Sequence, residues 1–107
     1  MDEAAFETLA ARTLEALASA IEDAGTDLEV ELQGGVLTVE LADGRQFVVN
    51  KHAANRQIWL SSPVSGAGHY APDRATGRWR DTRNGGDLSA RLAEELTALT
   101  GTSVALP

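Results

Sequence analysis

Apolar residues recur at every third or fourth position in the first part of the chain, which is the spacing of an amphipathic helix. The pattern runs from Glu3 to Asp23, and Gly25 follows as a stop signal. Its members are Phe6, Leu9, Ala10, Thr13, Leu14, Leu17, Ala20 and Ile21. At about 100° per residue, carboxylates collect on the side that lies away from the apolar stripe. We assign the stripe to Leu9, Thr13, Leu17 and Ala20, and the acidic side to Glu3, Glu7, Glu15 and Glu22.

The period of the pattern falls to two after this helix, which is typical of strands. Leu28, Val30 and Leu32 alternate with polar or acidic residues, and Gly34–Gly35 then turns the chain. A second turn is indicated by Asp43–Gly44, a strong hairpin signal. The predicted antiparallel strands cover residues 27–33, 36–41 and 46–49.

A fourth strand is predicted over Arg56–Ser62. Ile58 and Leu60 point to one face of the sheet there, whereas Trp59 points to the other face. The segment that follows is rich in turn residues and contains two aromatic pieces. We interpret these pieces as short strands at 69–70 and 78–80.

Leucines at helical spacing predict a second helix, with Asp87 as its N-cap and Gly101 as its C-cap. A length of 107 residues fits a single domain over 1–107. Two helices with one apolar stripe each cover only one face of a sheet. The expected fold class is therefore α/β (α+β), a two-layer sandwich with both helices on one face of a five- to six-stranded antiparallel sheet. The tail from Thr102 to Pro107 is expected to pack only lightly between the helices, which predicts modest stability.

Composition excludes several classes of function. The formal net charge of −7 repels phosphate backbones, so nucleic acid is not an expected partner. The absence of cysteine excludes disulfides, zinc-thiolate sites and cysteine-ligated clusters on this chain. No apolar run approaches the roughly 20 residues of a membrane span, so no membrane partner is expected. The N-terminus lacks the pattern of a signal or transit peptide, which favours a cytoplasmic bacterial protein or a mature mitochondrial form.

Catalytic motifs are also missing. The sequence has no nucleophile elbow, P-loop, dinucleotide fingerprint or Glu-x-x-His pair, so we expect no enzymatic activity. His52 and His69 are the only imidazoles, and an isolated histidine at a strand end is more often a surface residue than a ligand. We therefore assign neither histidine to a metal site.

Carboxylates from the first helix and the first strand approach each other if these elements pack side by side. We call the resulting group the acidic ridge, and it consists of Glu7, Glu15, Glu22, Asp23, Asp27, Glu29 and Glu31. Hard cations such as iron, manganese and calcium prefer oxygen ligands, but this spacing makes no closed cage. Any binding is expected to be weak and spread over several sites. The alternative is that these residues are solvated and serve only solubility.

Trp59 is expected on the face of the sheet that the helices leave open. An exposed tryptophan there indicates a binding surface. The alternative is a structural tryptophan that is packed across the sheet by Tyr70 or Trp79. The pattern of the sequence leaves both interpretations open.

Several segments resemble the frataxin family. The resemblance rests on Gly-Gly-Val-Leu-Thr-Val at 34–39, Val-Asn-Lys at 49–51, Asn-Arg-Gln-Ile-Trp-Leu-Ser-Ser-Pro at 55–63, Thr-Gly-Arg-Trp at 76–79 and the start of the second helix. It extends over nearly the whole chain, and the length is similar to that of the bacterial branch. Ala18 and Ser19 depart from the family pattern, because many relatives have carboxylates there.

The resemblance implies a fold, a cargo and partners. It implies the two-layer sandwich, weak binding of Fe²⁺ and Fe³⁺ on the acidic ridge, and docking onto a cysteine desulfurase and an iron-sulfur scaffold protein. The positions implied for partner binding are Asn50, Asn55, Arg56, Gln57, Trp59 and Ser61.

The leading functional hypothesis is an iron-binding accessory protein of iron-sulfur cluster assembly that modulates the desulfurase. The alternatives are a weak ferroxidase, an iron-storage protein or iron chaperone, and a docking domain whose acidity serves only partner binding. We expect a monomer that iron can drive into oligomers.

Overall fold

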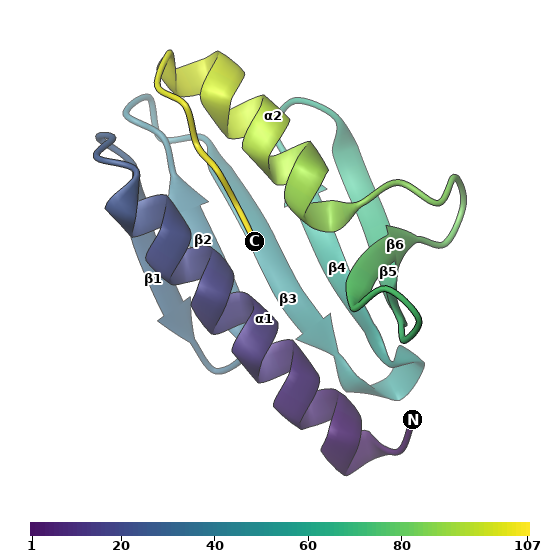
Figure 1. Cartoon of the computed structure of the whole chain (residues 1–107). Helices are drawn as coiled ribbons and strands as arrows, with labels where there is room; N and C mark the ends of the chain where they lie inside the picture. Colours follow the sequence, from purple (N-terminus) through teal and green to yellow (C-terminus); the bar gives the residue numbers. More distant parts are fainter.

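Two helices and one sheet form the molecule, and the computed structural model describes residues 1–107. Helix α1 (Glu3–Asp23) begins after Asp2, whose side chain accepts a hydrogen bond from the Ala5 amide at 2.7 Å. Helix α2 (Leu88–Thr100) is capped in the same way by Asp87, as the sequence predicts, and ends at Gly101 in the left-handed conformation. Both helices lie on the same face of the sheet (Figure 1). Neither helix is long and apolar enough to cross a membrane.

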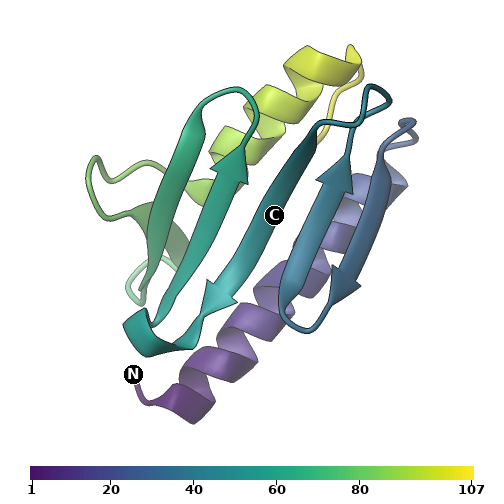
Figure 2. The same ribbon diagram turned by 180° about the vertical axis from the view of Figure 1, so that it is seen from behind.

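The sheet is a six-stranded antiparallel meander in which each strand pairs with the next one in sequence. Its strands are β1 (Glu29–Gln33), β2 (Val36–Glu40), β3 (Gln46–His52), β4 (Gln57–Ser62), β5 (Gly66–Asp73) and β6 (Arg78–Asp81), with a 3-10 turn, η1 (Ala53–Asn55), before β4. The predicted fold class is confirmed, although β3 and β5 are longer than expected and β1 starts two residues later. Figure 2 shows the opposite face of the sheet, which no helix covers.

Alternation along the strands separates a covered face from an open face. Leu37, Phe47, Ile58 and Tyr70 are buried under the helices as part of a hydrophobic cluster of 19 residues. Residues at the intervening positions, such as Trp59, lie on the open face. The sheet therefore contributes its core from one side only.

The buried stripe of α1 differs from the predicted stripe. Its buried residues are Phe6, Ala10, Leu14, Leu17, Ala18 and Ile21. Leu9, Thr13 and Ala20 are only half-buried, and the Thr13 hydroxyl accepts a hydrogen bond from Trp79 Nε1 at 2.9 Å. The predicted stripe was correct at Leu17 and wrong at its other three positions, because packing against the sheet buries the side of α1 that carries Phe6, Leu14 and Ile21. Ala18 is 6% exposed and belongs to the core, so only Ser19 weakens the acidic surface of the helix.

The C-terminal tail runs back between the two helices (Figure 1). Val104 is 3% exposed and is a member of the hydrophobic cluster, and Leu106 packs against this cluster. The Val104 amide donates a hydrogen bond to Thr97 Oγ1 at 3.0 Å. The expectation of light packing was therefore wrong, because Val104 closes the core between the helices.

Candidate functional site

Two helical members of the acidic ridge, Glu7 and Glu15, lie on the flank of α1 that faces Lys51 and the β1–β2 turn. Glu7 forms an ion pair with Lys51, the only lysine of the chain, and the two side chains are about one third exposed. Glu15 lines a hollow of about 290 Å³ with Leu32, Gly35 and Lys51. The protein thus supplies its own cation to this part of the ridge.

Gly35 is required for this arrangement. Its φ of 77° is in the left-handed region that glycine favours. A Cβ atom at this position would lie 2.5 Å from Lys51 Cε, because the lysine side chain crosses directly over the glycine on its way to α1. The Gly34–Gly35 turn therefore also makes room for the contact between Lys51 and Glu7.

The strand part of the ridge lies on the open face. Glu29 is directly opposite Glu40 of β2, and Glu31 is directly opposite Thr38. These residues and Gln46 line a hollow of about 330 Å³, and Gln46 Nε2 donates a hydrogen bond to Glu40 Oε1 at 2.9 Å. We call Glu29, Glu31 and Glu40 the strand carboxylates. Sequence reasoning missed Glu40, although the two-residue turn at Gly34–Gly35 fixes this register.

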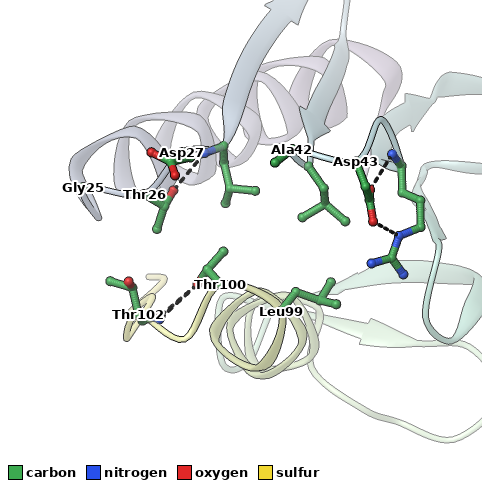
Figure 3. Close-up of a pocket in the computed structure, with 11 residues that line it drawn as sticks. Gly25, Thr26, Asp27, Ala42, Asp43, Leu99, Thr100 and Thr102 are labelled. Carbon is green, nitrogen blue, oxygen red and sulfur yellow. Dashed lines mark hydrogen bonds and ion pairs between the residues drawn. The ribbon is translucent and has the colours of Figure 1, made fainter.

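Asp27 lies at a third place, in the loop that joins α1 to β1, and Figure 3 shows it beside Thr26. It lines a cleft of about 350 Å³ between the α1–β1 loop, the β2–β3 turn and the end of α2. Across the cleft, Asp43 pairs with Arg45 at 2.8 Å. Hydrogen bonds from the backbone amide and the guanidinium of Arg45 lower the pKa of Asp43 below its ordinary value. Glu22 and Asp23 are exposed at the end of α1.

The predicted acidic ridge is therefore not one cluster. Helix α1 packs against β1, as expected, but Val30 and Val39 are paired on the covered face, so Glu29 and Glu31 point to the other face. No group of three Asp, Glu or His side chains is close enough together to hold a metal ion. The carboxylates lie at three separate places: the flank of α1, the open face of β1 and β2, and the end of the sandwich where α1 leads into β1.

Trp59 occupies the centre of the open face and is half-buried. Its ring is stacked between those of His52, at a centroid distance of 3.7 Å, and His69, at 4.3 Å. Its Nε1 donates a hydrogen bond to Gln57 Oε1 at 2.8 Å. The alternative in which Tyr70 or Trp79 packs against it was wrong, because both of those residues are buried on the covered face.

The other positions predicted for partner binding are distributed unevenly around this stack. Asn50 is directly opposite Trp59, and Ser61 is exposed on the same strand as Trp59. Asn55 is exposed in η1. Arg56 has a φ of 53°, and its guanidinium turns back to donate a hydrogen bond to the Ala53 carbonyl. Arg56 is therefore half-buried against η1 and less accessible than its neighbour Asn55.

A polar network at the far edge of the sheet was also missed from the sequence. Arg91 of α2 donates hydrogen bonds to the hydroxyls of Tyr70 and Ser65 and to the Gly66 carbonyl, and it pairs with Glu95. Burial raises the pKa of Tyr70. These contacts join α2 to β5 and explain why a charged residue is accommodated beside the core.

Taken together, the fold and these surfaces define a small acidic α/β protein whose exposed features are carboxylate groups and an uncovered sheet face with an aromatic centre. Comparison with known proteins gives the family. A family model described as "Frataxin-like domain" matches residues 1–102. The chain belongs to the frataxin-like family.

Relatives support this assignment over the whole chain. "Iron-sulfur cluster assembly protein CyaY" of Dechloromonas aromatica is 35% identical over 107 residues, which is 99% of both chains. "Frataxin-like protein, mitochondrial" of Leishmania donovani is 37% identical over 109 residues, and the match covers 94% of this chain but only 58% of that protein.

Solved structures of frataxins have the same fold as this chain. Trimeric yeast frataxin "complexed with ferrous" (Saccharomyces cerevisiae) is 36% identical, with a TM-score of 0.75 over 87% of this chain and 86% of that chain. Frataxin from Psychromonas ingrahamii has a TM-score of 0.89 over 98% of this chain and 97% of that chain. Its identity is 24%, so this second likeness concerns the fold alone.

Proposed function

We propose that this protein is an accessory protein of iron-sulfur cluster assembly that docks through its open sheet face and carries iron weakly on its carboxylates. The observation that carries this proposal is the full-length match to a bacterial relative whose name states that role. The chain has no cysteine with which to hold a cluster, so a role beside the assembly machinery fits its chemistry. We place this activity in the cytoplasm of a bacterium.

The proposed partners are a cysteine desulfurase and its scaffold protein. The docking surface consists of Asn50, Asn55, Gln57, Trp59 and Ser61, which are polar or aromatic and lie on or beside the uncovered face. Aromatic anchors surrounded by polar residues are typical of protein interfaces. The Trp59 side chain lies outside the hydrophobic cluster, so its role in docking is separable from the stability of the fold.

The test of docking is the affinity of Trp59→Ala for the desulfurase–scaffold complex from the same organism. We expect the dissociation constant to rise tenfold or more, which corresponds to at least about 1.4 kcal/mol. The control is Val64→Ala, because Val64 is 56% exposed and lies in the β4–β5 turn rather than on the docking surface. Unchanged binding of the Trp59 variant would contradict the proposal.

Iron binding is proposed to centre on the strand carboxylates. Glu29 and Glu31 take part in no ion pair of the chain, whereas Glu7 is already paired with Lys51. Carboxylate oxygens suit Fe²⁺ and Fe³⁺, but the absence of a three-ligand group favours weak binding at several sites.

Anaerobic titration with Fe²⁺, followed by NMR, tests this part of the proposal. Paramagnetic broadening should begin at the amides of β1 and β2 near Glu29, Glu31 and Glu40, and reach the Glu7 region only at higher iron concentration. Glu31→Gln should weaken the first phase, and Glu7→Gln should leave it unchanged. Broadening that begins at Glu7 and Glu15 would overturn the assignment to the strand carboxylates.

A weak ferroxidase activity and an iron-storage or chaperone role are the alternatives within the same family. Carboxylates stabilise Fe³⁺ more than Fe²⁺, so they favour oxidation by O₂. A ferroxidase would oxidise Fe²⁺ beyond the amount it binds, at a rate above that of buffer alone. We propose the accessory role without catalysis, and we propose that the protein acts as a monomer.

A further inference from the structure

We propose that His52 and His69 are positioning residues that fix the ring of Trp59 edge-on to the partner; this inference rests on the docking function proposed above. The two imidazole rings cover both faces of the indole ring, with interplanar angles of 8° for His52 and 13° for His69. A partner that approaches the open face therefore meets the edge of Trp59 rather than its face.

The sheet itself generates this arrangement. His69 of β5 is directly opposite Trp59 of β4, and Asn50 of β3 is directly opposite Trp59 on the other side. His52 lies two residues after Asn50, so it is the diagonal neighbour of Trp59, within reach of an aromatic side chain. Three neighbouring strands thus contribute one ring each to the same stack.

The third restraint on Trp59 comes from its own strand. Gln57 lies two residues before Trp59, on the same face, and accepts the Nε1 hydrogen bond at 2.8 Å. The two histidines restrain both faces of the indole ring, and the hydrogen bond to Gln57 restrains its edge. Together these contacts hold the ring in a single orientation. The polar group of Trp59 is already satisfied within the chain, so the partner gains apolar and edge contacts from this residue.

The hydrogen bonding of His52 shows which property of the imidazole matters. Its Nδ1 is buried and has no hydrogen-bond partner. An unpaired buried polar atom is unfavourable, so this ring is not held there by polar contacts of Nδ1. The flat shape of the ring, which stacks at 3.7 Å, is the property that the site uses.

Fixing the ring before binding favours affinity. An interface side chain that is free in the unbound protein loses its rotamer freedom on docking, at an expected cost of about 2- to 12-fold in the dissociation constant per side chain. The stack removes this loss for Trp59. Cation–π binding needs an accessible face of the indole ring, and the histidines cover both faces. A cationic group of the partner therefore gains no cation–π contact with Trp59.

The test compares flat and non-flat replacements of both histidines. The variant His52→Gln/His69→Gln keeps polar side chains but removes the stacked rings, and His52→Phe/His69→Phe keeps the rings but removes their nitrogens. The chain has two tryptophans, so labelling with 5-fluorotryptophan gives one ¹⁹F signal for Trp59 and one for the buried Trp79, which serves as an internal reference.

We expect the Gln variant to move the Trp59 signal toward that of unstructured fluorotryptophan, to leave the Trp79 signal in place, and to raise the dissociation constant for the desulfurase–scaffold complex about 5- to 10-fold. The Phe variant should keep both the Trp59 signal dispersion and an affinity within about twofold of the parent chain.

Three outcomes would overturn the inference. The first is a Gln variant whose Trp59 signal and affinity are unchanged. The second is a Gln variant in which Trp59 loosens but the affinity is unchanged. The third is a Phe variant that keeps Trp59 ordered but binds as weakly as the Gln variant, which would mean that the imidazoles contact the partner directly. If Trp59→Ala itself binds normally, the docking proposal fails instead, and the ¹⁹F result still decides whether the histidines order the ring.

Discussion

Trp79 and Trp59 lie on opposite faces of the same sheet and are held in different ways. Trp79 is 5% exposed, packs edge-on against Phe6 at a centroid distance of 6.1 Å and donates to the hydroxyl of Thr13. Trp59 is half-buried and is held by two imidazoles and Gln57. The tryptophan of the covered face joins helix to sheet, whereas the tryptophan of the open face is held by side chains of that face and is the residue for which we propose an external contact.

The same contrast applies to charge. On the covered side, Arg91 pairs with Glu95 and Arg78 pairs with Asp87. The buried Asp81 has no cation beside it, but its carboxylate accepts hydrogen bonds from the backbone amides of Arg83 and Asn84. On the open face, Glu29 is opposite Glu40 without a cation between them. Like charges at directly opposite positions destabilise a sheet, so the repulsion between these two carboxylates lowers the stability of the fold.

The largest expected effect is that of Trp79→Ala on stability. Removing this buried ring should lower the free energy of unfolding by about 3 to 5 kcal/mol, because it leaves a cavity between α1 and β6. Trp59→Ala should lower it by at most about 1.5 kcal/mol, the value of its stacking. Urea unfolding measures both. Equal losses for the two variants would remove the distinction between a structural and a functional tryptophan.

The tail provides the next test of the covered face. Val104→Ala should lower the free energy of unfolding by about 2 kcal/mol, because Val104 lies in the core between the helices. Ala105→Ser is the matched control, since Ala105 is exposed, and it should change stability by less than about 0.5 kcal/mol. Thermal and urea unfolding of the two variants give the comparison. A Val104 variant as stable as its control would restore the expectation of a lightly packed tail.

A smaller effect is expected at the start of α2. The side-chain hydrogen bond from Arg78, at 2.6 Å, lowers the pKa of Asp87 below its ordinary value of 3.8. A lowered carboxyl pKa contributes stability that is present at neutral pH and is lost as the pH falls below 3.8 through the lowered value. Asp87→Ala should lose about 1 kcal/mol at pH 7, since the helix cap is also lost.

Asp87→Asn separates these two contributions. Asparagine is a good N-cap but carries no charge, so this variant should keep the helix cap and lose only the ion pair. Its stability should depend less on pH than that of the parent chain between pH 5 and pH 2. Identical acid unfolding curves for the Asn variant and the parent would show that the ion pair with Arg78 contributes nothing.

The smallest effect is expected on the open face and has the opposite sign. Glu40→Gln should raise the free energy of unfolding by about 0.2 to 1 kcal/mol, because it removes the carboxylate opposite Glu29. Glutamine can keep a hydrogen bond to Gln46. Glu31→Gln is the control and should stabilise less, since Glu31 faces Thr38. Urea unfolding at low salt resolves this difference best, because salt screens the repulsion between the carboxylates. A lower free energy of unfolding for Glu40→Gln would show that Glu29 and Glu40 do not destabilise the sheet.

Local patterns predicted most of the fold. The alternation around Ile58, Trp59 and Leu60 gave the correct faces because the period of a strand is two and leaves no ambiguity. The stripe of α1 was misplaced because alanine and threonine at positions such as Thr13 and Ala20 widen the apolar side of the helix, and only packing against the sheet selects Phe6, Leu14 and Ile21. Ala18 falls outside the apolar pattern of the sequence, and only the packing of α1 against the sheet shows that it is buried.

The site was less predictable, because it depends on contacts between distant segments. The ion pair of Lys51 with Glu7 joins residues 44 positions apart. The His52–Trp59–His69 stack requires the register of three strands and the conformations of three side chains. Glu40 is different, since its position opposite Glu29 follows from the tight turn at Gly34–Gly35 by counting back along both strands.

Strand β1 is one of the two edges of the sheet, because it pairs only with β2, as β6 pairs only with β5. A free edge offers its backbone to a strand from another molecule, and charged side chains are a common defence against such pairing. Glu29 and Glu31 place negative charge along this edge, so two copies that approach edge to edge repel each other. A cation that neutralises these side chains would weaken that defence, which links the occupancy of the carboxylates to the solubility of the protein.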